Sequence, residues 1–159
     1  MPWEVTIRSA ENTALGTPEE LRQQITTSVP AFEFYREPSG VEKIEAARAS
    51  GVAFPQVIRE SIERQPASVR AEYEGEGISI LLYGFEDPTR EINVEIRGMG
   101  NPLPVLANIC QPNGWVAIED ATGNEIDLSS NDAQDWESFQ KYRDLAIRQF
   151  VCTDHEEPA

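Results

Sequence analysis

The sequence predicts a single α+β domain built on a mostly antiparallel, twisted sheet of about six or seven strands, with helices packed mainly on one face. Runs of alternating apolar and polar residues, typical of half-buried strands, are interspersed with segments whose apolar residues recur every three or four positions, typical of helices. Three of the strands follow one another through short turns, which favours antiparallel pairing. A chain of 159 residues, 40% of them apolar, matches the size of one domain.

The first three elements are predicted to be a strand, a helix and a strand. Apolar side chains at alternate positions of residues 3–8 indicate a strand buried on one face. Thr17 supplies an N-cap hydroxyl and Pro18 a first-turn proline, and apolar residues every four positions then predict a helix over residues 18–28. Residues 32–35 alternate again and predict a second strand.

Two helices and a three-stranded meander are expected next. Residues 41–49 form the first helix, and Pro55 opens a second one whose inward face is expected to hold Ile58 and Ile62. Alternation then predicts consecutive strands at residues 69–74, 78–85 and 92–96. The middle strand is the most apolar of the three, so we expect it to be central in the sheet.

The last third of the chain predicts a short helix over residues 104–110, a strand over 115–118, a short strand over 125–128 and a helix over about 135–150. The expected inner face of the last helix comprises Trp136, Phe139, Leu145, Ala146 and Phe150. The predicted element order is therefore β-α-β-α-α-β-β-β-α-β-β-α. We expect the domain to span residues 1–151 and residues 152–159 to form an acidic, disordered tail.

No targeting or membrane segment is predicted, so we expect a cytoplasmic protein with no membrane partner. The N-terminus has no basic segment followed by an apolar one. The most apolar window, residues 78–85, is far shorter than the ~20 residues of a membrane-spanning helix. Cys110 and Cys152 fit neither a redox nor a zinc spacing, and Cys110 is expected to be a small buried apolar residue.

The familiar catalytic motifs are missing from the sequence, and no cofactor is predicted. His155 is the one histidine, and it lies in the expected tail, where nothing would hold it beside a nucleophile. Gly98 and Gly100 stand between a predicted strand and helix, as in a phosphate-binding loop. However, Pro102 and Pro104 remove backbone donors there, which favours a tight turn.

A metal site is also not predicted. Oxygen-bearing side chains are dense in one stretch, but they do not match the spacing of a calcium loop; they are Asp120, Asn124, Glu125, Asp127, Asn131 and Asp132. Binding of a divalent ion there is kept as a less favoured hypothesis.

Net charge is the most informative feature of the composition. The chain carries −15 at pH 7, divided into −3 for residues 1–66 and −12 for residues 67–159, and residues 98–140 contain no lysine or arginine. Direct nucleic-acid binding needs a basic surface and is therefore disfavoured. The acidic stretch indicates either a face for a basic protein partner or a generic solvated surface.

These observations favour a non-enzymatic binding module, most concretely an immunity or inhibitor protein that occludes a basic partner such as a toxin. The expected partner-binding residues are Trp115, Glu119, Asp120, Glu125, Asp127, Asp132, Asp135 and Glu137. The alternative is a structural or regulatory subunit that docks through its sheet edge or last helix, and an enzyme that uses carboxylates or a divalent ion is less favoured. Strand order, oligomeric state and the partner's identity do not follow from the sequence.

Overall fold

The computed structural model describes residues 2–129 and 134–153; in the last helix it describes the side chains of residues 136–145 and 148. Six strands form one antiparallel sheet in the order β2-β3-β4-β5-β1-β6. The strands are β1 (Trp3–Ser9), β2 (Glu33–Glu37), β3 (Ser68–Gly75), β4 (Ile78–Tyr83), β5 (Glu91–Gly98) and β6 (Trp115–Glu119). The helices are α1 (Pro18–Ser28), α2 (Gly40–Ala49), α3 (Gln56–Glu63), α4 (Leu103–Cys110) and α5 (Gln134–Thr153), with a 3-10 turn η1 (Gln111–Asn113) after α4.

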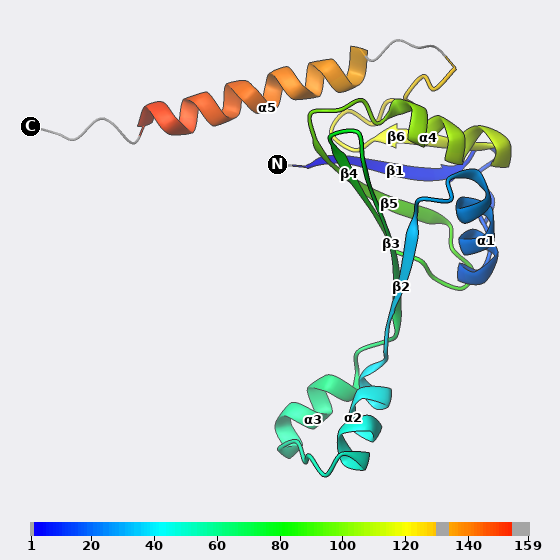
Figure 1. The fold of residues 1–159 in the computed structure, drawn as a ribbon, viewed down its shortest axis with the longest axis vertical. Coiled ribbons are helices and arrows are strands. Elements are labelled where there is room, and N and C mark those ends of the chain that lie inside the picture. The colour runs from blue at the N-terminus through cyan, green and yellow to red at the C-terminus, as the bar shows by residue number, and fades with distance from the viewer. Residues whose placement is uncertain (1, 130–133, 154–159) are drawn as a thin grey trace, which may run out of the picture.

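Helices α1 and α4 cover one face of the sheet, and the core lies between them and the strands (Figure 1). The strands supply their alternate apolar residues to this core, among them Val5, Ile80, Val94 and Ala117. The polar residues of the same strands necessarily point to the other face, because successive side chains of a strand alternate. The predicted fold class, a mostly antiparallel α+β domain, is confirmed.

Helix α1 begins as the sequence predicts. The Thr17 hydroxyl accepts a hydrogen bond from the backbone N–H of Glu20 at 3.3 Å, and Pro18 occupies the first turn. Leu21 and Ile25 lie one turn apart on the buried side of the helix. The cap and the apolar spacing together fix which side of α1 meets the sheet.

The prediction of a short strand over residues 125–128 is wrong. The chain makes one isolated bridge between Ile118 and Glu125, and the N–H of Ile126 donates to Ala117 O at 2.8 Å. Pairing ends there because the Asp127 carboxylate accepts hydrogen bonds from the N–H and hydroxyl of Ser129, which turns the chain aside. The segment still lies along β6 and covers part of that edge of the sheet.

Helix α5 packs on the sheet with its first half. Trp136 and Phe139 lie against Trp3, with ring centroids 5.3 and 6.1 Å from that indole. Gln140 donates to Met99 O and Arg143 to Gly98 O. These contacts anchor the helix where β1 begins and β5 ends.

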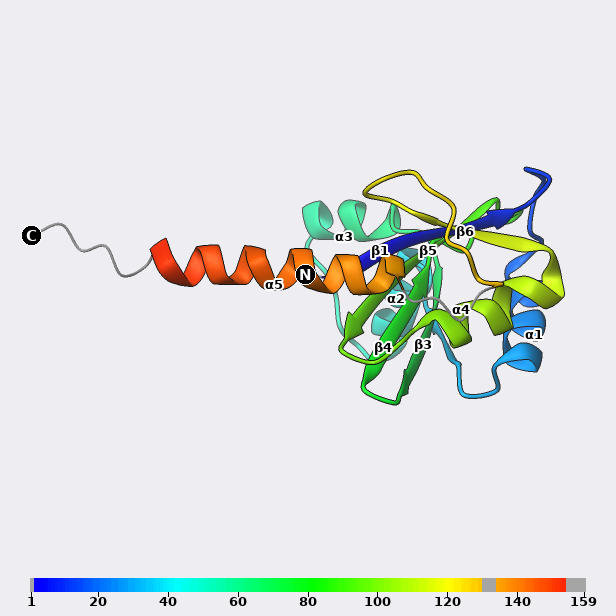
Figure 2. The ribbon, with the colours of Figure 1, turned by 90° about the horizontal axis from the view of Figure 1, so that it is seen from above.

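Beyond Arg143, α5 extends away from the body of the protein (Figures 1 and 2). Leu145 is therefore 58% exposed, which corrects its expected place on the inner face. The helix also continues to Thr153, past the expected domain end at residue 151. The expected inner side chains Ala146 and Phe150, and the rest of the tail with His155, lie outside what the structure describes.

Helices α2 and α3 form a hairpin between β2 and β3, and it stands clear of the sheet at the far end of these strands (Figure 1). The two helices pack mainly on each other, with Ile44 buried and Ile62 half-buried between them. Ile58 is half exposed, which corrects the expectation that it faces inward. The reason is that the hairpin has no sheet or helix of the body beneath it.

None of the described helices combines the length and the apolar character needed to cross a membrane.

Candidate partner-binding face

The candidate site is the face of the sheet opposite α1 and α4, which we call the open face. It carries the polar positions of the alternating strands, because the apolar positions are turned to the core. In the part of the chain that the structure describes, helices α1 and α4 pack on the other face (Figure 2). The polar side chains of the open face are exposed or partly exposed.

One line of cross-strand neighbours on the open face is almost entirely acidic. Register pairs Glu33 with Glu72, Glu72 with Leu81, Leu81 with Glu95, and Glu95 with Glu4. Asp120 completes the line beside Glu4, since its N–H donates to Glu4 O at 3.1 Å. We call this line the acidic row; from one edge to the other it comprises Glu33, Glu72, Leu81, Glu95, Glu4 and Asp120. At ~4.8 Å between strands, the row extends roughly 24 Å across the whole sheet.

The carboxylates of the row are only partly compensated by arginines. Arg70 lies 3.2 Å from Glu72 and Arg97 lies 3.7 Å from Glu95. Glu4 is directly opposite Glu95, an arrangement in which like charges repel. Among the described residues, neither Glu4 nor Asp120 takes part in an ion pair. The row therefore keeps an excess of negative charge.

The excess negative charge affects the pKa of Tyr83. Its side chain lies on the open face in the line next to the row and is 37% exposed. Burial raises the pKa of Tyr83 above its usual value, and the negative charges of Glu95, Glu4 and Asp120 raise it further. Carboxylates from three different strands or strand ends thus act on one phenol.

A second tyrosine, Tyr35, lies two strands away from Tyr83, on the edge strand β2. The Tyr35 hydroxyl donates to Glu33 Oε2 at 2.6 Å, and the Arg70 guanidinium lies 5.4 Å from the centre of the Tyr35 ring. The hydrogen bond and the charge of Glu33 raise the pKa of Tyr35. With Leu81, the two tyrosines give the acidic face apolar surface that a partner can contact.

The structure disperses the residues that the sequence predicts for partner binding. Trp115 is 8% exposed and packs in the core, so little of its ring is available to a partner. Glu119 is half-buried on the core side of β6 and accepts a hydrogen bond from Trp3 Nε1 at 3.0 Å. Asp120, the next residue, is exposed on the open face and accepts from the Thr6 hydroxyl at 2.7 Å.

The remaining predicted residues lie elsewhere. Glu125 and Asp127 belong to the segment beside β6, and Glu137 is exposed on α5. Asp132 is outside the described residues, and the side chain of Asp135 is not described. The basic-free stretch is therefore divided among the core, the sheet edge and α5, and of its described carboxylates only Asp120 belongs to the row.

Sequence reasoning missed four of the five carboxylates of the row, Glu4, Glu33, Glu72 and Glu95. Each occupies a polar position of a strand that the sequence predicts, so the signal was an acidic residue on the outer face of four of the six strands. What the sequence does not contain is the strand order and register that bring these positions into one line.

The other sequence candidates have structural roles. Burial raises the pKa of the Cys110 thiol to about 12, so the thiol stays protonated at physiological pH. The N–H groups of Met99 and Gly100 donate to Gly77 O. A β-carbon on Gly98 would lie 2.2 Å from the same oxygen, so the glycine lets this loop contact the β3–β4 turn.

Within residues 2–129 and the described part of α5, no group of three or more His, Cys, Asp or Glu side chains is placed to hold a metal ion. Comparison of the chain with protein-family models, with curated proteins and with solved structures finds no match.

Proposed function

We propose that the protein is a non-enzymatic module that binds a basic protein partner across the open face of its sheet. The acidic row carries the proposal, because it places five carboxylates in one line across the sheet, with Leu81 between Glu72 and Glu95, and keeps an excess of negative charge. The like-charged neighbours Glu4 and Glu95 cost stability in the free protein. A cationic partner would relieve that repulsion on binding.

Apolar contacts on the same face support a specific complex rather than diffuse attraction. Tyr35, Leu81 and Tyr83 lie within or beside the row and offer side-chain surface that a partner can bury. Charge complementarity mainly accelerates association and selects the partner, whereas buried aromatic and aliphatic contacts provide most of the binding free energy.

The most concrete form of this function is an inhibitor or immunity protein for a cationic toxin such as a nuclease. A nucleic-acid backbone is a line of negative charges, and the acidic row is a line of carboxylates on strands ~4.8 Å apart, interrupted once by Leu81. Binding of the row at a basic nucleic-acid site would exclude the nucleic acid by occupying the same arginines and lysines.

The test compares partner capture by two variants with equal net charge. The first neutralises four residues of the row, Glu4→Gln, Glu72→Gln, Glu95→Gln and Asp120→Asn. The control neutralises exposed acids on other surfaces, Glu11→Gln, Glu19→Gln, Glu45→Gln and Glu60→Gln. We expect the wild type and the control to capture the same basic protein at low salt. The row variant should associate with that protein about tenfold more slowly or worse.

Two outcomes would overturn the proposal. Equal loss of binding in both variants would show that total charge matters and the row does not. Binding that persists unchanged at high salt would show that the contact is apolar, because exposed charges more than ~8 Å apart are screened at physiological ionic strength and closer ones become screened at higher salt.

A structural or regulatory subunit of a larger assembly remains the second candidate. The observation that favours it is the apolar surface of the α2–α3 hairpin, which is distant from the acidic row along β2 and β3 (Figure 1).

A further inference from the structure

The α2–α3 hairpin concentrates the exposed apolar surface of the molecule. Half of the large apolar side chains that are exposed among the described residues lie on it, namely Val41, Val52, Phe54, Val57 and Ile58. Val57, in the first turn of α3, is 81% exposed. Such a concentration of exposed apolar side chains on one small element is typical of an interaction surface.

The apolar side of α3 is only partly covered, because Ile62 is half-buried against α2 whereas Val57 and Ile58 are exposed. The helix is strongly amphipathic, yet none of its residues is buried. Its contact with α2 is made near the helix ends, where a β-carbon on Gly40 would lie 1.5 Å from Ile62 O. The close contact with α2 thus uses the Ile62 end of α3 and leaves Val57 and Ile58 facing outward.

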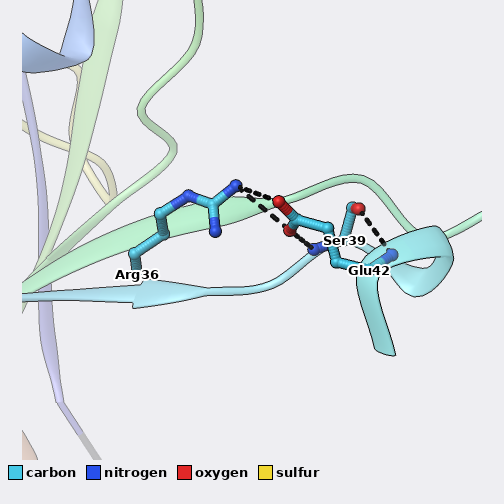
Figure 3. A network of polar contacts seen from close by, with 3 residues as sticks. All are labelled: Arg36, Ser39 and Glu42. Carbon is cyan, nitrogen blue, oxygen red and sulfur yellow. Dashed lines mark hydrogen bonds and ion pairs between the residues drawn. The ribbon is translucent and has the colours of Figure 1, made fainter. Parts of the chain in front are cut away.

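Polar contacts connect the start of the hairpin to strand β2 (Figure 3). Ser39 and Glu42 form a capping box: the N–H of Glu42 donates to Ser39 Oγ at 3.2 Å, and the N–H of Ser39 donates to Glu42 Oε2 at 2.8 Å. Arg36 of β2 donates to both carboxylate oxygens of Glu42, at 3.0 and 3.1 Å. These contacts restrict the orientation of α2 relative to β2, and a surface that is restricted before binding loses less entropy on binding.

Charge on the hairpin differs from charge on the rest of the chain. Residues 40–65 contain four acidic and four basic side chains, so this segment is neutral while the whole chain carries −15. Arg59 and Glu63 pair within α3 at 2.9 Å, and Lys43 pairs with Glu37 of β2 at 2.8 Å. A strongly charged partner of either sign finds no complementary excess here.

We propose that the hairpin is a self-association surface that joins two copies of this chain. The partner that matches a neutral, apolar helix pair is another neutral, apolar helix pair, and a second copy supplies one. In a two-fold contact, α3 packs on α3 of the second copy and the two hairpins form a four-helix arrangement that buries Val57 and Ile58.

The position of the hairpin makes this contact compatible with two acidic bodies. Copies carrying −15 each repel one another wherever their sheets approach. A ten-residue helix such as α2 is ~15 Å long, whereas charges are screened beyond a Debye length of ~8 Å in physiological salt. Contact through the hairpins therefore separates the charged bodies by more than the range of their repulsion.

The test is the association state of the full chain, measured by sedimentation equilibrium at low and high salt. We expect a dimer that becomes tighter as salt rises, because salt screens repulsion between the bodies and leaves the apolar contact intact. Val57→Glu and Val57→Arg should each raise the dissociation constant about tenfold or more, since both place a charge in the contact. The matched control is Leu145→Glu, an equally charged change at an exposed leucine of α5.

A monomeric wild type at all protein and salt concentrations would overturn the proposal. So would a dimer that is lost in the Leu145 variant, which would place the contact on α5, or one that weakens with salt, which would place it on charged surfaces. Retained secondary structure in both Val57 variants, measured by circular dichroism, excludes unfolding as the cause. None of these results depends on the acidic row, so the hairpin proposal and the proposed function can fail separately.

Discussion

The open face and the α2–α3 hairpin are both uncovered surfaces of this molecule, but they differ in the kind of group that they expose. The open face lines up carboxylates over a large apolar core. The hairpin exposes valine, isoleucine and phenylalanine side chains and has only a very small apolar core of its own. Its net charge is zero. An uncovered surface is informative when its composition differs from that of an ordinary polar surface. Here the open face is more acidic than such a surface, and the hairpin is more apolar.

The difference predicts opposite responses to salt. Added salt weakens attraction between the acidic row and a basic partner, whereas it screens the repulsion that opposes contact between two hairpins. A single protein should therefore show one interaction that salt suppresses and one that salt promotes. The two opposite salt responses are expected only if the hairpin and the sheet behave as separate structural units. That independence is the first point to test.

Gly40→Ala is expected to have the largest effect, because an added β-carbon would meet the backbone oxygen of Ile62 at 1.5 Å. The helices must move apart, which also strains the hydrogen bond of 2.8 Å from Gly40 N to Gln65 O. We expect the hairpin to lose about 1–3 kcal/mol of local stability. Amide hydrogen exchange should then show faster exchange over residues 41–63 and unchanged protection in β4 and β5.

The control for this substitution is Gly51→Ala. A β-carbon there meets no atom within 4 Å, although its φ of +78° costs backbone strain. That variant should open the hairpin less than Gly40→Ala does. Equal loss of protection in β4 and β5 of the Gly40 variant would show that the hairpin and sheet unfold as one unit, and the comparison would fail.

Glu4→Gln tests whether repulsion within the acidic row lowers the stability of the folded protein. Because Glu4 is directly opposite Glu95, removing its charge should raise the free energy of unfolding by roughly 0.2–1 kcal/mol at low salt, and by less at high salt. Urea unfolding of the wild type, the Glu4 variant and Glu11→Gln at two ionic strengths measures this. Glu11 is exposed outside the row, so its variant should not change the unfolding midpoint. A destabilised Glu4 variant would mean that the carboxylate has a favourable partner.

Local signals in the sequence were sufficient for most elements. The alternation of residues 3–8 and the cap at Thr17 predict β1 and α1 because the forces involved act between residues close in the chain. The short strand over residues 125–128 failed because a side-chain hydrogen bond from Ser129 to Asp127 replaced backbone pairing.

The site depended on information that is not local. Periodicity places Glu72 and Glu95 on the outer side of their strands, but the order β2-β3-β4-β5-β1-β6 decides which carboxylates become neighbours. Likewise, Ile58 has the spacing of a core residue, and only the position of the hairpin beyond the sheet leaves it exposed. Amphipathicity predicts that a helix has an apolar side and does not say what covers it.

The smallest predicted effect is a change in the titration of Tyr83. Its folded-state pKa is raised above 10.0, first by burial and then by Glu95, Glu4 and Asp120. A raised pKa means that this phenol contributes stability at pH values below 10, and that the contribution is lost as pH rises through the folded-state value. Glu95→Gln should therefore lower the pKa of Tyr83 toward 10.0 without reaching it, because burial remains the first cause.

NMR titration of ring-labelled tyrosine measures this directly, with Tyr35 as the internal control, since its pKa is raised chiefly by Glu33. The contrary result would be a pKa of Tyr83 that Glu95→Gln leaves unchanged, together with a pKa of Tyr35 that Glu33→Gln lowers. The carboxylates would then act only on their immediate neighbours, and the row would not produce a shared electrostatic field.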